Sequence, residues 1–184
     1  MTRVTALPRA GPRTRADLEG LPADGHRYEL VDGVLVVGPS PRYGHQDAVG
    51  HLYLLLHAAC PPGLKVLLAP FDVALADDTV LVPDLLVARR DRFTDRDLPE
   101  APLLAVEVLS PSTRRFDRLL KRDRLQAAGC PSYWLVDPDV PTVTVLELRD
   151  GGYEQVLHLE GVATDDVTLP FPVRLQRSAL RDPD

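Results

Sequence analysis

The strongest constraint on the fold is an apolar run, residues 103–110, that contains a single charged residue, Glu107. Apolar runs of this length are typical of strands that are covered on both faces. The run therefore predicts a central strand in a sheet with other elements packed on each side. It also places a carboxylate where burial is expected.

The rest of the chain alternates short strands with a few helices. Residues 42–59 have apolar side chains at helical spacing, and the Cys-Pro-Pro-Gly run that follows ends that helix. A second helix, 117–128, is expected to end at Gly129, and a short helix, 15–21, to follow Thr14. Further strands are expected in a hairpin with its turn at Asp32-Gly33, and in the segments 65–70, 71–75, 79–88, 133–137, 142–148 and 152–159, with a charged loop at 89–102. This order favours a mixed α/β fold.

Length and composition fit a soluble protein with one main domain: 184 residues, 45% hydrophobic and 26% charged. Residues 1–13 show no periodicity and predict a flexible N-terminal arm, so residues 14–184 are expected to form the single domain. No signal-peptide pattern and no membrane-length apolar stretch is present, which favours a cytoplasmic protein without a membrane partner. Cys60 and Cys130 lie far apart and form no zinc pattern.

The formal net charge of −6 is unfavourable for a protein that binds nucleic acid, because neutralising phosphates supplies much of the affinity. The charge is unevenly spread, however. Basic residues are concentrated in one strip, interrupted only by Asp117 and Asp123: Arg114, Arg115, Arg118, Lys121, Arg122 and Arg124. Such a strip is compatible with an acidic remainder, and a homodimer would pool two of them.

Asp84 and Glu107 each interrupt an apolar run. A buried carboxylate is costly unless it is paired, hydrogen-bonded or bound to a metal. Two such acids on neighbouring strands would repel each other, and a hard divalent cation such as Mg²⁺ removes that repulsion. The alternative is that Asp84 caps a turn after Pro83 and Glu107 pairs with an arginine. The pattern alone leaves both interpretations open.

Six segments, in order, resemble the Uma-type putative restriction endonuclease family of the PD-(D/E)XK nuclease superfamily. They cover roughly residues 25–160 and read RYELVDGVLV, GHQ, LAPFDVAL, VPDLLV, LLAVEVLSPST and FDRLLKRDRLQAAGCPSYWLVDP. The resemblance implies an α/β, restriction-endonuclease-like core. In such a core a central mixed sheet is flanked by helices and carries additional antiparallel hairpins.

The resemblance also implies a metal site. Asp84 would be the first ligand, Glu107 the second and the backbone carbonyl of Val108 the third, holding Mg²⁺ with Mn²⁺ as a substitute. The superfamily's lysine stands two residues after the second acid, but Leu109 occupies that position here. In this family the lysine comes from the following helix, at the position of Lys121.

Glu29 and His45 complete the catalytic set that the resemblance implies. Each has a structural alternative: Glu29 could face solvent on its hairpin, and His45 could cap its helix or pack at the edge of the core. Lys121 could lie on a solvated face, because apolar residues lie on both sides of its helix. Two positions depart from the family, since Leu125 stands where members often have Tyr and Ser132 where they often have Glu.

The predicted activity is metal-dependent hydrolysis of phosphodiester bonds in nucleic acid, with DNA favoured by family analogy alone. Two other functions stay open. One is a catalytically silent nuclease fold that serves as a binding or assembly module. The other is a metal-dependent phosphodiesterase that acts on RNA or on nucleotides.

Overall fold

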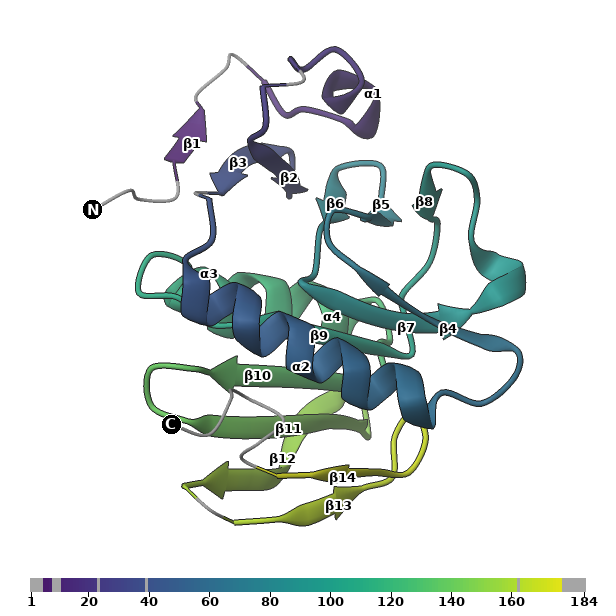
Figure 1. Ribbon diagram of the computed structural model, residues 1–184. Coiled ribbons are helices and arrows are strands. Elements are labelled where there is room, and N and C mark those ends of the chain that lie inside the picture. The colour runs from purple at the N-terminus through teal and green to yellow at the C-terminus, as the bar shows by residue number, and fades with distance from the viewer. Residues whose placement is uncertain (1–4, 8–10, 23, 39, 162, 177–184) are drawn as a thin grey trace.

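The computed structural model describes residues 5–7, 11–22, 24–38, 40–161 and 163–176 (Figure 1). Its central sheet has the strand order β12-β11-β10-β9-β7-β4. Strands β9 and β10 are parallel neighbours, whereas the other pairs in this sheet are antiparallel, so the sheet is mixed as predicted. The strands of the central sheet are β4 (Leu64–Leu68), β7 (Leu85–Arg89), β9 (Leu104–Val108), β10 (Ser132–Asp137), β11 (Thr142–Arg149) and β12 (Gly152–Glu160).

Strand β9 lies inside the sheet, between β7 and β10, and all five of its residues are buried. This confirms the prediction drawn from the apolar run around Glu107. Because side chains alternate along a strand, Glu107 points to the same face as Ala105 and Leu109, whereas Val106 and Val108 point to the opposite face.

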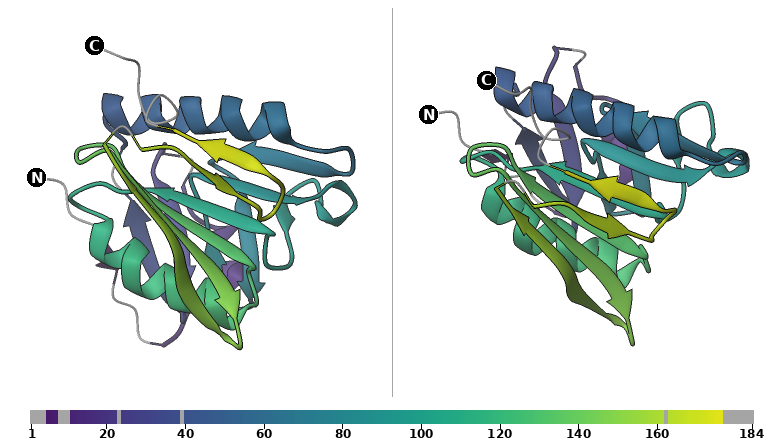
Figure 2. Two further views of the ribbon diagram at one scale, coloured as in Figure 1. Left: turned by 90° about the horizontal axis from the view of Figure 1, so that it is seen from below. Right: turned by 60° about the horizontal axis from the view of Figure 1, so that its bottom comes forward.

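Each face of the central sheet packs against a helix. Helix α2 (Tyr43–Ala59) covers the face of Val106, together with a two-stranded ribbon, β13 (Asp165–Val167) and β14 (Val173–Leu175). The helical segment 114–127 covers the face of Ala105 and contributes Leu125 to a second core cluster. Figures 1 and 2 show the sheet between these two helical layers.

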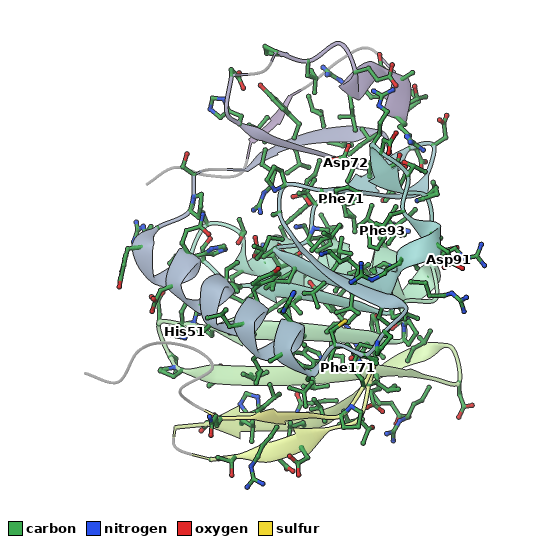
Figure 3. All side chains as sticks on the ribbon, turned by 45° about the vertical axis from the view of Figure 1, so that its right-hand side comes forward. His51, Phe71, Asp72, Asp91, Phe93 and Phe171 are labelled. Carbon is green, nitrogen blue, oxygen red and sulfur yellow. The ribbon has the colours of Figure 1, made fainter. Side chains whose placement is uncertain are left out.

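The N-terminal sheet has the order β1-β3-β2-β6-β5-β8. Its β2–β3 hairpin turns at Asp32 and Gly33, whose φ angles are 51° and 73°, so the predicted turn is confirmed. Phe71 and Phe93 pack edge to face beside this sheet, with ring centroids 5.6 Å apart (Figure 3). Its strands are β1 (Thr5–Leu7), β2 (Arg27–Val31), β3 (Val34–Gly38), β5 (Asp72–Ala76), β6 (Thr79–Leu81) and β8 (Asp97–Leu98).

Three local predictions need correction. Strand β1 pairs with β3, so the predicted N-terminal arm contains paired backbone, and residues 1–4 and 8–10 lie outside the described residues. Helix α1 (Arg15–Leu18) ends earlier than predicted. The predicted loop 89–102 contains a 3₁₀ turn, η1 (Arg90–Arg92), and strand β8. Long-range pairing satisfies backbone groups in these segments, and local sequence patterns do not report it.

The second predicted helix begins earlier and is less regular than expected. It consists of α3 (Arg114–Phe116), a π-helical turn, η2 (Asp117–Lys121), and α4 (Arg122–Ala127). Its predicted end is confirmed, because Gly129 has φ 81° and the Cys130 N–H donates to the Leu125 carbonyl at 2.9 Å.

Candidate active site

Lys121 lies inside the protein among three carboxylates. Its Nζ is 2.9 Å from Oε1 of Glu107, 2.9 Å from Oε1 of Glu29 and 3.6 Å from Oδ1 of Asp117. The Lys121 residue is only 1% exposed. The alternative in which Lys121 lies on a solvated face is therefore wrong, and so is an arginine as the partner of Glu107.

The π-helical turn presents Lys121 to the sheet. Asp117, Lys121 and Leu125 follow each other at intervals of four and are all buried, whereas Leu119 and Leu120 are exposed. A π-helical turn contains more residues than an α-helical one and is frequently found at functional sites. The irregularity therefore lies at the residues that bring Lys121 to Glu107.

Asp84 follows Pro83 in the short connection between β6 and β7, so it precedes the strand that it was expected to interrupt. Its Oδ1 accepts from Nη1 of Arg27 at 2.8 Å, and its Oδ2 lies 3.1 Å from Nε2 of His45. Oδ2 also accepts from the backbone N–H of Val108 at 2.9 Å. Asp84 therefore connects separate elements, and the interpretation as a simple turn cap is wrong.

Glu29 is also buried, with 2% exposure, although it lies on a hairpin strand. Its Oε1 accepts from the backbone N–H of Val82 at 2.7 Å and contacts Lys121. The alternative in which Glu29 faces solvent is therefore wrong. His45, in the first turn of α2, reaches Asp84 and neither caps its helix nor lies at a purely apolar edge.

All five side chains of the predicted set thus lie in one polar group: Glu29, His45, Asp84, Glu107 and Lys121. Two parts compose it, one around Lys121 and one around Asp84. They meet at β9, where Glu107 contacts Lys121 and the next residue, Val108, donates to Asp84.

The group contains more carboxylates than permanent cations. Four buried acids, Glu29, Asp84, Glu107 and Asp117, face Arg27 and Lys121. Uncompensated negative charge inside a protein is unfavourable. An additional cation would therefore stabilise this group.

The pKa values reflect the same imbalance. Burial raises the pKa of Glu107 well above its ordinary value, although Lys121 acts against it. Burial also raises the pKa of Asp117 to about 6. For Asp84, burial is outweighed by the His45 hydrogen bond and the Arg27 charge, which hold its pKa well below the usual range.

The chemistry of the donors fits a hard divalent cation, since carboxylate and carbonyl oxygens are the ligands that Mg²⁺ prefers. The predicted set combines two carboxylates, Asp84 and Glu107, with the carbonyl of Val108. Within the described residues, no group of three or more His, Cys, Asp or Glu side chains is arranged to hold a metal. The metal-binding roles of these three residues therefore stay predictions.

Solvent reaches the group on the side of Arg27 and His45. The Arg27 side chain is 23% exposed and that of His45 is 11% exposed, whereas that of Asp84 is 4% exposed. Nε of Arg27 and Nδ1 of His45 are buried without a hydrogen-bond partner among the described residues. These two side chains are therefore the ones that an approaching ligand meets first.

Sequence reasoning missed two members of the group, Arg27 and Asp117. Both had a signal. Arg27 stands two positions before Glu29 on one strand, which places the two side chains on the same face. Asp117 stands four positions before Lys121, the spacing at which side chains on a helix are neighbours.

A mixed central sheet between helices, with acids and a lysine gathered beside its inner strand, defines a protein with a restriction-endonuclease-like fold. The chain belongs to the Uma2 family, described as "Putative restriction endonuclease", which it matches over residues 15–180. The resemblance noted in the sequence is thereby confirmed.

A solved structure supports the same fold. It is the crystal structure of "a putative nuclease belonging to DUF820" from Anabaena variabilis ATCC 29413, with a TM-score of 0.72 and 21% sequence identity, and the match covers 92% of this chain and 97% of that chain. No curated protein matches the chain. Among the described residues, no helix is both long and apolar enough to cross a membrane.

Proposed function

We propose that the protein is a metal-dependent endonuclease that hydrolyses phosphodiester bonds in nucleic acid, with DNA as the preferred substrate. The observation that carries this proposal is the buried ammonium group of Lys121, 2.9 Å from both Glu29 and Glu107. Membership of the Uma2 family supports the nuclease class. The preference for DNA rests on the description of the family as a restriction endonuclease.

Asp84, Glu107 and the backbone carbonyl of Val108 would hold Mg²⁺, with Mn²⁺ as a substitute. When bound, the metal would polarise the phosphate and lower the pKa of a coordinated water. The excess of carboxylates over permanent cations in the group supports this assignment.

The side chains of the protein have distinct roles in this proposal. Lys121 provides a fixed positive charge that stabilises the negative charge developing on phosphate oxygens and orients the nucleophile. Glu29 holds the lysine in place through its own bond to the Val82 N–H. Arg27 and His45 orient Asp84 and form the partly exposed side of the group, where a guanidinium group suits a phosphate.

Cleavage assays test the activity. Wild type, Asp84→Ala and Lys121→Ala are incubated with supercoiled plasmid, single-stranded DNA and RNA in the presence of Mg²⁺ or Mn²⁺. Wild-type protein should cut DNA, and each variant should be slower by about 10²-fold or more, the loss typical when an electrostatic catalytic group is removed. The matched control is Arg96→Ala, which changes an exposed charge and should cut normally. If wild type and both site variants behave alike on every substrate, the enzyme proposal is wrong.

Calorimetric titration tests the metal site separately. Mg²⁺ titrated into wild type should bind, and Glu107→Gln, which keeps the shape of the side chain but removes its charge, should bind more weakly. Thermal unfolding of both proteins without metal shows whether the variant is folded. Binding without any cleavage would instead indicate a catalytically silent nuclease fold, and cleavage confined to RNA would indicate a different phosphodiesterase.

A further inference from the structure

A hollow with a volume of about 620 Å³ lies outside the buried group, and its lining is part polar and part apolar. One wall is the helical segment 114–127, which provides Arg118 and Arg122. The other wall consists of β10, β11 and β12, which provide Thr144, Leu146 and Gln155 among others. Figure 2 shows this helical segment beside the β11–β12 hairpin.

The hollow is electropositive although the chain as a whole is acidic. No acidic residue lines it, and Arg118 has no ion pair among the described residues. Among the described residues, Arg122 makes one long hydrogen bond, 3.4 Å to the Tyr153 carbonyl, and its buried Nε has no partner there. By contrast, Arg114 and Arg124 of the same segment are neutralised by acids at 2.7 Å. The two arginines of the hollow therefore keep their charge available for a ligand.

The lining combines charged, apolar and hydrogen-bonding groups, which a nucleotide chain would contact with its phosphates, rings and polar atoms. Guanidinium groups bind phosphate oxygens in a bidentate manner. Leu146 and Tyr153, each 7% exposed, form a small apolar floor, and Thr144 and Gln155 provide hydrogen-bonding groups. The volume also lies within the range of ligand-binding pockets, roughly 300–1,000 Å³. A phosphate-bearing chain with attached rings fits this combination better than an inorganic anion does.

The hollow and the buried group share one helical segment. Arg118 and Arg122 flank Lys121 on the same helical segment, but Lys121 points to the sheet interior whereas the two arginines line the hollow. An acidic surface repels a polyanion in general, so local positive charge must supply the attraction. We infer that the hollow binds the sugar-phosphate backbone of the proposed nucleic acid substrate, an inference that rests on the proposed function.

Fluorescence anisotropy with labelled single-stranded and duplex DNA tests the inference, with Ca²⁺ in place of Mg²⁺ to suppress cleavage. The double variant Arg118→Ala/Arg122→Ala should bind about tenfold more weakly than wild type. For single strands, the slope of log affinity against log salt concentration should be shallower by ~1.4 in the double variant, because two phosphate contacts are lost. Thermal unfolding shows whether the variant is folded.

Arg115→Ala is the matched control, because Arg115 is an exposed arginine of the same segment that does not line the hollow. It should change affinity by less than about threefold. An equal loss in this control would show that affinity comes from the basic strip as a whole and would overturn the inference. Unchanged binding by the double variant would overturn it too, and so would displacement of DNA by equimolar mononucleotide or inorganic phosphate.

The two proposals fail in different ways. DNA binding that depends on Arg118 and Arg122, without cleavage under Mg²⁺, would support the hollow and overturn the endonuclease proposal. Cleavage by wild type combined with unchanged binding by the double variant would overturn only the inference that the hollow binds nucleic acid. A wild-type protein that neither binds nor cleaves nucleic acid would overturn both.

Discussion

Lys121 has an unusual environment for a lysine, because its charge is buried and depends on neighbours from three parts of the chain. Burial alone would lower its pKa, but the charges of Glu107, Glu29 and Asp117 outweigh burial and raise it. The lysine therefore stays protonated in the folded protein. The carboxylates in turn depend on it, since removal of one partner leaves buried charges uncompensated.

We therefore expect Lys121→Met to destabilise the fold by about 3–5 kcal/mol near pH 8. The loss should be smaller near pH 5, where Glu107 and Asp117, whose pKa values are raised, take up protons. Urea unfolding at the two pH values measures this difference. Arg118→Met, an exposed position on the same segment, should change the free energy of unfolding by less than about 0.5 kcal/mol. A Lys121→Met loss that is identical at both pH values would contradict the coupling.

Asp117 predicts a second pH dependence. Its pKa rises from 3.8 to about 6 on folding, mainly through burial. Between these values the unfolded chain has lost the proton that the folded protein keeps, so the free energy of unfolding decreases as pH rises. Between about pH 4 and about pH 7, the free energy of unfolding of wild type should fall by up to ~3 kcal/mol relative to that of Asp117→Asn. Urea unfolding across this window measures it.

Asp123→Asn is the control for this titration, because Asp123 is an exposed acid on the same helical segment. Its stability should follow wild type at every pH. A constant difference between wild type and Asp117→Asn across the window would show that Asp117 does not carry a raised pKa.

At the scale of single residues, the sequence identified the acids better than it identified their partners. Asp84 and Glu107 stood out because a charge in an apolar run requires compensation. Lys121 could be found only through resemblance, because the side on which a helical residue points depends on packing. Arg27 and Asp117 were missed because their only signal is spacing, two positions from Glu29 on a strand and four positions from Lys121 on a helix.

At the scale of elements, the π-helical turn Asp117–Lys121 decides where two site residues point. Its start is held by Tyr133, whose hydroxyl donates to the Asp117 carbonyl at 2.9 Å. Its exposed side carries Leu119 and Leu120. A change in the number of residues here should therefore rotate Asp117 relative to Lys121 without altering any buried side chain.

Deletion of Leu120 tests this geometry. A π turn holds more residues than an α-helical turn, so the loss of one residue lets this segment continue as a regular α-helix. Asp117 and Lys121 then stand three positions apart instead of four, and one of the two side chains must shift from its place in the buried group. We expect the free energy of unfolding to fall by more than about 3 kcal/mol, and cleavage to be lost if the proposed function holds. Leu120→Ala keeps the chain length and should cost less than about 0.5 kcal/mol. Equal stability of the two variants would contradict a role for the π turn.

Local sequence patterns predicted some strands and turns and did not predict others. The β2–β3 hairpin followed from Asp32-Gly33, which adopts the positive φ angles that such turns require. Strands β13 and β14 were not predicted, because three residues are too few to show alternation. Strand β1 was read as part of an arm, since its partner β3 is distant in the sequence.

At the scale of the whole molecule, the two cysteines report on global unfolding. Cys130 is fully buried, and burial raises the pKa of its thiol to about 11. Cys60 is partly exposed. In a Cys60→Ser protein, Cys130 should therefore stay unlabelled by a thiol reagent at pH 8 until denaturant unfolds the chain. In Cys130→Ser, Cys60 should be labelled in the native protein. Rapid native labelling of Cys130 would contradict the described core.

The balance of charge also belongs to this scale. The chain carries a net charge of −6, and two arginines of the basic strip, Arg114 and Arg124, are paired with acids. The other three arginines of the strip, Arg115, Arg118 and Arg122, make no ion pair among the described residues and can attract a polyanion. A homodimer that pools two such surfaces stays a prediction.

The polar group around Lys121 draws its members from positions that run from Glu29 on a hairpin to Lys121 on a late helix. No stretch of the chain made before residue 121 contains all of them. During synthesis the emerging polypeptide thus has no assembled set of acids and lysine to act on nearby polymers. If the proposed function holds, hydrolytic activity requires completed folding, so a measurement of that activity would also report the amount of correctly folded protein.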